Sequence, residues 1–535
     1  MSIKNLCLGV VGLIAAGPAI AVTSTVSGSG ENDYMFIDNA VDNEYFITSS
    51  KLDPRFSGAN VWMHYKSNQV SLGYMGFVGW TGVNRYYDMW ISNSSISQPF
   101  AGIRCMNSGS TCPASGYIAA EHLDREGFYH TMSGNSVYNG SYGFGSLSPT
   151  AYVYFRNLPV GNSETYQLNL CTTATDYDYK TGQRCKDLPS GASWRIYNLT
   201  LNKISHLELK STGAMAEIWV ASDGTPSISS GSDSCKIAIV DKKSGLSCRM
   251  IAYNLKETKV LSSSLTMQMI IDKAILGFTP GAADIKYSGD GVTWTNFGTS
   301  KAYSSIFTPS GEYVNIFMSN DFFKSALNAG TNLTNKDGIF TFAFKNSVSP
   351  ESGFYQFTPS TKLNILPREY GISIVSTDGS TNPKASGKIG EDSPPIEFDY
   401  KVTTSAARQA DSITAQVKGD SVTLAGVPYC LFKSPDESLQ VPIPAYLSWI
   451  SSTGSEVKVR NSCSEAPVDM TDATWVQTAW NASVNDGFFF TTTLKLLFPM
   501  NDLRSKLSVN DEDWMGTVSA SGTVEVTAKW IGVDK

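Results

Sequence analysis

The sequence is poor in charged residues. Asp, Glu, Lys and Arg make up 17% of its 535 residues, against about a quarter in an ordinary globular domain. The formal net charge is −7 and the isoelectric point is near 5.3, so the chain has no basic excess with which to bind phosphate groups. We therefore expect no nucleic-acid partner and no attraction to anionic lipid.

The short motifs of known enzyme sites are also absent. The sequence contains no His-Glu-x-x-His, Gly-x-Ser-x-Gly, Walker or dinucleotide-binding glycine motif. Of its four histidines, His122 and His130 lie in a charge-dense stretch, which is more typical of a solvated loop than of a catalytic triad. The acidic run Asp511-Glu512-Asp513 is expected to form an exposed turn rather than a glycosidase acid pair. We predict no catalytic residue.

Metal and cofactor sites are not expected. No CxxC motif occurs and the four histidines are scattered, which disfavours a zinc site. Asp176, Asp178 and Asp187 could supply oxygen ligands to calcium, but they do not follow the order of an EF-hand. We therefore predict no metal ion and no cofactor.

No hydrophobic run is long enough to span a bilayer, which takes about 20 residues. The apolar run from Leu6 to Ala16 follows Lys4 and precedes the small-x-small triplet Ala19-Ile20-Ala21. This order is typical of a signal peptide, cleaved here after Ala21. Because Cys7 lies at the start of the apolar run and not at its end, we expect export without lipidation.

Cysteine usage fits an exported protein. Cys7 leaves with the signal peptide, and an even number remains, as an oxidising compartment favours. The eight are Cys105, Cys112, Cys171, Cys185, Cys235, Cys248, Cys430 and Cys463. Sequence alone leaves their connectivity open, but they form four well-separated pairs. We predict that each cysteine bonds its nearest neighbour: Cys105 to Cys112, Cys171 to Cys185, Cys235 to Cys248 and Cys430 to Cys463.

Alternation of apolar and polar residues indicates β-strands from end to end. Ile396, Phe398, Tyr400 and Val402 alternate with charged residues, and the same pattern recurs at Ile413 to Val417 and at Val524 to Trp530. The best helical segment is Ser319 to Ala329, with Ser319 as its cap. We predict an all-β fold of tandem sandwich domains.

Composition also suggests where the domains divide. A stretch rich in Gly, Ser, Lys and Pro from Pro367 to Pro395 marks the clearest boundary, and a softer one lies between Leu201 and Gly213. Because about 514 mature residues exceed what one hydrophobic core supports, we predict three domains. After the signal peptide at 1–21, they are an N-terminal domain at 22–205, a middle domain at 206–367 and a C-terminal domain at 368–535.

An aromatic and polar stretch in the N-terminal domain is the best candidate for a ligand-binding surface. Trp and Tyr rings can stack on sugar faces while Arg, Asp and Asn bond the hydroxyl groups. The candidates are Trp80, Arg85, Tyr86, Tyr87 and Trp90. The competing interpretation, favoured for any single residue, is that these rings fill a sandwich core.

Several longer strings, spread through the mature chain, carry a family resemblance. They include Leu52-Asp-Pro-Arg-Phe-Ser-Gly-Ala-Asn-Val-Trp62, Ser244-Gly-Leu-Ser-Cys-Arg-Met250, Ser349-Pro-Glu-Ser-Gly-Phe-Tyr355 and Asp469-Met-Thr-Asp-Ala-Thr-Trp475. With the export signal and the cysteine pairs, the chain resembles the tip adhesins of the Escherichia coli common pilus, a chaperone-usher fimbria.

The resemblance implies both an assembly route and a function. The C-terminal domain would be an immunoglobulin-like, pilin-type sandwich that lacks one strand. That strand would come first from a periplasmic chaperone and then, at the outer-membrane usher, from the N-terminus of the major pilin. The N-terminal domain would be the adhesin domain at the fimbrium tip. It would bind a host-cell receptor, for which a glycan is one candidate, and attach bacteria to host cells or to one another in biofilms.

The start of the mature chain agrees with a terminal position. A strand donor needs a free tail of alternating apolar residues, and the segment Val22 to Gly30 offers only Val22 and Val26. Such a chain would accept a strand and give none. Two alternatives stay open: a minor structural pilin without receptor binding, and a secreted carbohydrate-active enzyme.

Overall fold

The computed structural model describes residues 21–39, 44–50, 55–59, 63–65, 69–71, 73–78, 84–105, 113–133, 142–212, 215–228, 234–261, 264–330, 338–347, 354–359, 362–378, 382–481 and 484–532. The predicted signal peptide lies outside them, apart from Ala21. Strands dominate these residues and three short α-helices interrupt them, so the all-β prediction is confirmed. In these ranges no helix is long and apolar enough to cross a membrane.

The N-terminal domain holds one helix and fourteen strands among the described residues. The helix is α1 (Pro149–Asn157), and the strands are β1 (Thr25–Asn39), β2 (Tyr45–Ser49), β3 (Phe56–Ala59), β4 (Met63–Tyr65), β5 (Gln69–Ser71), β6 (Tyr74–Val78), β7 (Tyr86–Ser92), β8 (Phe100–Arg104), β9 (Tyr117–Ala119), β10 (His122–Leu123), β11 (Gly127–Met132), β12 (Tyr142–Leu147), β13 (Ser163–Thr173) and β14 (Ala192–Ser211).

The middle domain follows with two helices and twelve described strands. The helices are α2 (Lys273–Leu276) and α3 (Asn320–Asn328), and the strands are β15 (Met215–Val220), β16 (Pro226–Ile228), β17 (Cys235–Val240), β18 (Lys243–Glu257), β19 (Leu265–Ile271), β20 (Ile285–Ser288), β21 (Thr295–Asn296), β22 (Lys301–Ala302), β23 (Tyr313–Ser319), β24 (Phe340–Asn346), β25 (Phe354–Phe357) and β26 (Lys362–Pro367).

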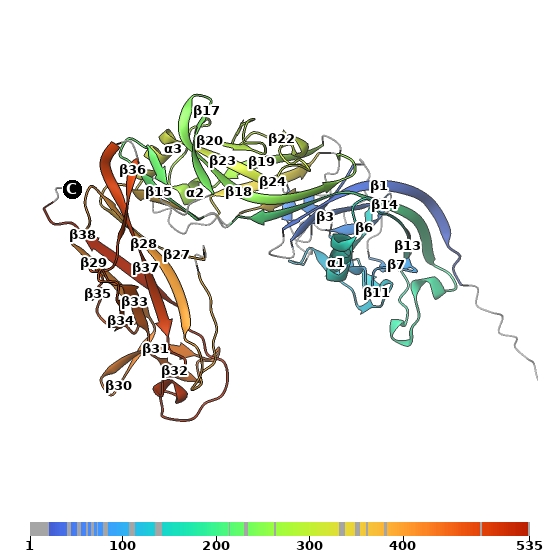
Figure 1. Ribbon diagram of the computed structural model, residues 1–535. Helices are drawn as coiled ribbons and strands as arrows, with labels where there is room; N and C mark the ends of the chain where they lie inside the picture. Colours follow the sequence, from blue (N-terminus) through green and yellow to red (C-terminus); the bar gives the residue numbers. More distant parts are fainter. Residues whose placement is uncertain are drawn as a thin grey trace, which may run out of the picture.

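One sheet runs through both of these domains. Strand β1 pairs with β14 in parallel from Thr25 to Asn39, and the far end of β14 pairs with β18 of the middle domain (Figure 1). Tyr34 and Phe36 of β1 face the core of the N-terminal domain, while Met35 and Ile37 face the core of the middle domain. The two domains are therefore built on the two faces of shared strands. The predicted division at residues 205 and 206, which stays a prediction, falls within β14.

The C-terminal domain is a sandwich of two facing sheets. Its strands are β27 (Gly371–Ser376), β28 (Ile396–Ala406), β29 (Ser412–Gly419), β30 (Ser421–Leu424), β31 (Val427–Lys433), β32 (Gln440–Ile443), β33 (Tyr446–Ile450), β34 (Glu456–Arg460), β35 (Val468–Asp469), β36 (Val476–Asn481), β37 (Val484–Phe498) and β38 (Gly522–Lys529). One sheet has the order β27-β28-β37-β33-β34, with β36 beside β37, and the other has the order β35-β29-β38. Strands β30, β31 and β32 form a small third sheet.

A polar junction joins the middle and C-terminal domains. The carboxylate of Glu217, on β15, is almost fully buried and accepts hydrogen bonds from Lys401 Nζ at 2.8 Å and from Thr403 Oγ1 at 3.4 Å. The Ser373 hydroxyl on β27 also donates to it. Beside these contacts the Trp219 ring packs against Phe489, with centroids 5.6 Å apart. The N-terminal and C-terminal domains lie at opposite ends of the molecule, with the middle domain between them (Figure 1).

The predicted helix and the described disulfides agree with the sequence pattern. Helix α3 begins after Ser319, whose hydroxyl accepts a hydrogen bond from Phe322 N, so this prediction is confirmed. Three disulfides join nearest-neighbour cysteines: Cys171 with Cys185, Cys235 with Cys248, and Cys430 with Cys463. Cys105 is buried, and its predicted partner Cys112 lies outside the described residues.

Candidate functional site

The predicted receptor-contacting residues fall into three groups. Tyr87 and Trp90 are buried, with 2% and 4% of their surface exposed. Arg85 and Tyr86, at the start of β7, are half-buried. Trp80 lies outside the described residues. A buried ring supports the sheet but offers no surface to a receptor, so among the described members of the set Arg85 and Tyr86 are the ones that can contact one. The receptor-binding assignment stays a prediction.

Trp90 belongs to a compact aromatic cluster on the outer face of β7 and β13. The cluster also contains Tyr129, Tyr177 and the disulfide of Cys171 and Cys185, and Trp194 packs against its edge. The chain that covers it is the segment 174–191 between β13 and β14. We call this segment the stapled loop, because its Cys185 is bonded to Cys171 in β13.

His130 ties the stapled loop to the sheet. A β-bulge between Phe128 and Thr131 of β11 and a left-handed backbone at His130, with φ of 54°, turn its side chain toward the loop. The imidazole lies between the rings of Tyr86 and Tyr179, with centroids 4.3 Å from each. Both ring nitrogens are occupied, because Nδ1 lies 2.7 Å from Glu121 and Nε2 lies 2.6 Å from Asp176.

The prediction of a solvated loop is therefore wrong for His130, which is 6% exposed. The burial of its ring alone would lower its pKa, but hydrogen bonds and charges from Asp176 and Glu121 outweigh that effect and raise it. The charged imidazolium is the form that this geometry favours. With both nitrogens bonded to carboxylates, His130 is suited to hold the loop and not to act as a general base.

Asp88 fixes the same loop from beneath. Its buried carboxylate accepts hydrogen bonds from the backbone N–H groups of His130 at 3.0 Å and Cys185 at 2.7 Å, and from the hydroxyl of Tyr177. Burial raises the pKa of Asp88, while these donors and Arg184 lower it in part. The three aspartates weighed as calcium ligands have other contacts, since Asp176 bonds His130, Asp178 caps a short turn and Asp187 accepts from Arg184 N.

A second candidate site lies in the C-terminal domain, where two strand edges are open. Strand β27 pairs with β28, and β38 pairs with β29. The two strands lie side by side. Tyr370, just before β27, contacts Trp530, just after β38, with ring centroids 5.6 Å apart. No backbone ladder joins β27 to β38 in the described part of this domain.

Apolar side chains line the space between these edges and are incompletely covered. Ile372 and Ile374 of β27 are half-buried. So are alternate residues of β38, which are Val524, Val526 and Ala528, followed by Trp530. The opposite face of β38 carries polar residues such as Thr527 and Glu525, which are exposed. A half-open apolar row beside a free strand edge is the geometry that an added strand would complete. We call it the acceptor groove.

The segment that follows the predicted signal peptide is itself part of a sheet. From Thr25 to Asp33, β1 pairs with residues Arg195 to Asn202 of β14, and Val22 N donates to Leu188 O at 3.2 Å. The described residues before Asn39 are therefore held within the N-terminal domain.

Comparison with known proteins covers nearly the whole chain. Models described as the N-terminal and middle domains of the E. coli common pilus adhesin EcpD match residues 21–207 and 211–362, and the EcpD C-terminal domain matches residues 369–528. The chain belongs to the E. coli common pilus adhesin family. A binding role, and not a catalytic one, follows from this membership.

Curated members of the family are similar to this chain over its full length. The fimbria adhesin EcpD of Escherichia coli O18:K1:H7 (strain IHE3034 / ExPEC) is 35% identical, with 99% of this chain and 100% of that protein covered. The fimbria adhesin EcpD of Escherichia coli K12 is 34% identical over the same shares.

Among solved structures, CfaE, the adhesive subunit of the CFA/I fimbria of enterotoxigenic Escherichia coli, is 9% identical. The match covers 55% of this chain and 79% of that chain, with a TM-score of 0.19. A likeness this weak carries no argument about this chain.

Proposed function

We propose that this protein is the tip adhesin of a chaperone-usher fimbria and that it accepts, but does not donate, a complementing strand. The observation that carries the proposal is the acceptor groove. A periplasmic chaperone would fill it first, and the N-terminal strand of the major pilin would replace the chaperone strand at the outer-membrane usher. The protein would then be displayed on the cell surface.

The acceptor groove supports strand acceptance through two kinds of contact. The free edge of β38 offers backbone N–H and C=O groups to a ladder, and the half-buried apolar row offers sites for alternate side chains. Completing the burial of one large aliphatic side chain is worth about 1.5 to 3 kcal/mol. Several such side chains therefore give the incoming strand a large hydrophobic contribution.

The terminal position is supported by the course of β1. A donor strand must leave its own domain, but Thr25 to Asn39 are hydrogen-bonded to β14. Releasing them would also uncover Tyr34 and Phe36, which are buried. The weak apolar pattern of the tail and its engagement in the sheet both favour a subunit with no further subunit beyond it.

Receptor binding is assigned to the N-terminal domain, which lies at the end of the molecule away from the acceptor groove (Figure 1). Its outer face combines half-exposed rings, Tyr86, Tyr179 and Trp194, with the half-buried cations Arg184 and Lys186. Rings beside polar groups suit a sugar ligand. A host-cell receptor bearing a glycan is thus the partner that this surface fits best.

The groove is tested with two neighbouring substitutions on β38. Val526→Arg places a charge in the apolar row, whereas Thr527→Arg places it on the exposed face of the same strand. We expect a peptide copying the N-terminal strand of the major pilin to bind the Val526→Arg variant at least about tenfold more weakly, because a desolvated charge would have no partner. The Thr527→Arg variant should bind the peptide as the unmodified protein does. Equal binding by both variants would contradict the proposal.

Attachment is tested with the rings of the outer face. Alanine at Tyr86 or Tyr179 removes a stacking surface, and we expect about a tenfold loss of binding to host cells, or about 1 to 2 kcal/mol per ring. Val292→Ala, at an exposed site of the middle domain, is the control. Saturable binding that is indifferent to both rings would place the receptor site elsewhere. No saturable binding by the unmodified protein would favour a structural pilin.

A further inference from the structure

The C-terminal domain has one occupied end and one free end. Strand β28 runs between them over 11 residues, about 36 Å at about 3.3 Å per residue. Its C-terminal part lies at the middle domain, since Lys401 and Thr403 contact Glu217. Its first residue, Ile396, packs against a small cluster formed by Val441, Ile443 and Met500 at the opposite end, where β30 and β32 lie farthest from the middle domain (Figure 1).

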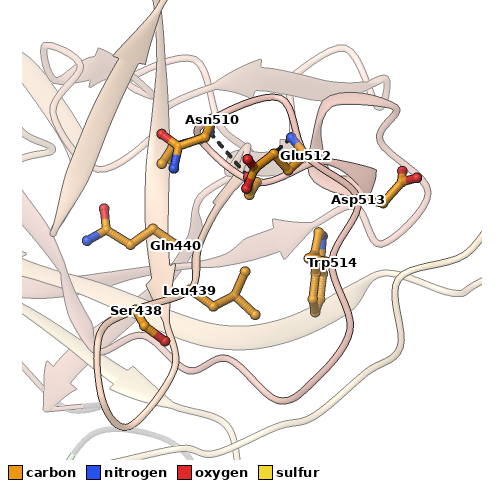
Figure 2. A pocket seen from close by; sticks show the side chains of 9 residues that line it. Ser438, Leu439, Gln440, Asn510, Glu512, Asp513 and Trp514 are labelled. Atoms are coloured by element: carbon orange, nitrogen blue, oxygen red, sulfur yellow. Dashed lines mark hydrogen bonds between the residues drawn. The ribbon is translucent and has the colours of Figure 1, made fainter.

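A cavity of about 280 Å³ opens at this free end. Leu439 and Trp514 face one another across it, Glu512 and Asp513 belong to the lining, and the Asp513 carboxylate points outward from the rim (Figure 2). The walls are held in place by hydrogen bonds. Val509 N donates to Gln440 O at 3.0 Å, and Trp514 Nε1 donates to Ser505 O at 3.0 Å. The expectation that Asp511-Glu512-Asp513 forms an exposed turn is confirmed, and this turn is one wall of the cavity.

The surroundings of the cavity are unusual for a surface that faces only water. Met515 and Leu503 are 94% and 78% exposed, although they flank well-bonded turns. Arg504 pairs with Asp511 at 3.1 Å, but among the described residues Glu512 and Asp513 take part in no ion pair. Exposed apolar side chains beside unpaired carboxylates, on an ordered scaffold, are typical of an interface with another protein.

One segment of chain connects the cavity to the acceptor groove. The turn that lines it continues through Val518, which packs in the cluster at the free end, and Ser519, which bonds Lys433 of β31. The chain then enters β38, one edge of the groove. A subunit that places its strand in the groove must keep its folded body at one end of it. The middle domain occupies the other end, which leaves the free end.

We propose that the cavity and its rim seat the folded body of the subunit whose strand fills the acceptor groove. The fitting partner surface carries an apolar side chain, to enter between Leu439 and Trp514, next to a Lys or Arg that pairs with Glu512 and Asp513. This inference rests on the proposed strand acceptance. It adds to the strand a second contact between the two subunits, at the free end of the C-terminal domain.

The test uses the full chain assembled into fimbriae by cells that express the whole operon. The photo-crosslinking amino acid p-benzoyl-phenylalanine replaces Met515 at the cavity rim, Val524 in the groove, or Val292 on the middle domain as the control. We expect Val524 to capture the N-terminal strand of the next subunit. Met515 should capture a residue of the folded body of that subunit, identified by mass spectrometry, and Val292 should capture neither.

Charge reversal supplies the matched comparison. The variant Glu512→Lys/Asp513→Lys should lower the Met515 crosslink to the pilin body about fivefold, because a rim charge pair is lost. Glu312→Lys, at an exposed site of the middle domain, should leave it unchanged. A Val524 crosslink without any Met515 crosslink would overturn this inference and leave strand acceptance standing. Absence of both crosslinks in fimbriae that contain the adhesin would overturn strand acceptance itself.

Discussion

In the N-terminal domain, single side chains join the stapled loop to the sheet that it covers. His130 is the clearest case, because its ring contacts two carboxylates and three tyrosines drawn from β7, the residue before β10 and the stapled loop. The groups that face it are Glu121, Asp176, Tyr86, Tyr177 and Tyr179, and Asp88 accepts from its backbone N–H. Burial alone would destabilise the charged imidazolium, but the hydrogen bonds and charges of the two carboxylates stabilise it by more, so the charged form is favoured.

This arrangement makes the stapled loop sensitive to pH. The pKa of His130 is raised in the folded protein, so the folded state binds the proton more tightly than the unfolded state does. The stabilisation is complete below about pH 6.5, the ordinary pKa of histidine, and is lost as pH rises through the raised value. We expect tryptic cleavage after Lys180, in the exposed part of the loop, to become faster between pH 6 and pH 9.

The control for this prediction is His130→Gln, which keeps hydrogen-bonding capacity without a titrating group. Its cleavage rate, measured under the same conditions, should follow only the pH dependence of trypsin. A loop that is cleaved with the same pH profile in both proteins would show that His130 does not govern it.

At the scale of elements, the helices show what local sequence can and cannot reveal. Helix α3 was predictable because Ser319 caps it, its apolar residues share one face, and Gly330 follows it. Helix α1 was not predicted, although Ser148 before Pro149 is a cap followed by proline in the first turn. That signal was present in the sequence, but the many aromatic residues around it matched a strand equally well.

The cap of α1 gives a prediction for this element. The Ser148 hydroxyl accepts a hydrogen bond from Ala151 N at 3.1 Å, and the helix buries Tyr152 and Phe155. Ser148→Ala should lower the free energy of unfolding by about 1 kcal/mol, because the first turn loses its acceptor. Chemical denaturation followed by tryptophan fluorescence measures the change. Ser190→Ala, in an exposed loop position, should have no effect, and equal effects would contradict the capping role.

The candidate sites were predictable in unequal measure. The acceptor groove follows from the alternation at Val524 to Trp530 together with the resemblance to pilins. The role of His130 could not be foreseen, because it depends on a bulge in β11 and on contacts 46 residues away in sequence. Tyr87 and Trp90 could not be separated from Tyr86 by sequence, since burial depends on which face of β7 each side chain occupies and on what covers that face.

At the scale of the whole molecule, Glu217 governs how the C-terminal domain is held. It is a buried carboxylate that bonds Lys401, Thr403 and Ser373 of the other domain. A Cβ at Gly371 would collide with the Trp219 ring and with Pro367 O, so the two domains approach closely here. Gly371 and Ser373 belong to β27, and the alternate residues of that strand, Ile372 and Ile374, line the acceptor groove.

We therefore expect Glu217→Ala to loosen this junction without unfolding either domain. Lys401 would lose its carboxylate partner, and Thr403 and Ser373 would lose an acceptor. Small-angle X-ray scattering should give a broader distribution of interatomic distances for the variant, while circular dichroism stays unchanged. Glu312→Ala, on an exposed part of the middle domain, is the matched control. An unchanged distance distribution for Glu217→Ala would show that apolar packing alone holds the junction.

The pairing of β1 with β14 has a mechanical consequence for an attached bacterium. Strand β14 runs lengthwise from the N-terminal domain into the middle domain (Figure 1), and β1 lies parallel to it from Thr25 to Asn39. In the proposed attachment, a pull between a surface-bound N-terminal domain and the fimbria would act along these strands. Ladder hydrogen bonds lie across the direction of such a pull, so they resist it together in shear and are not peeled apart one at a time. Liquid flow past an anchored cell thus loads the strongest direction of the sheet.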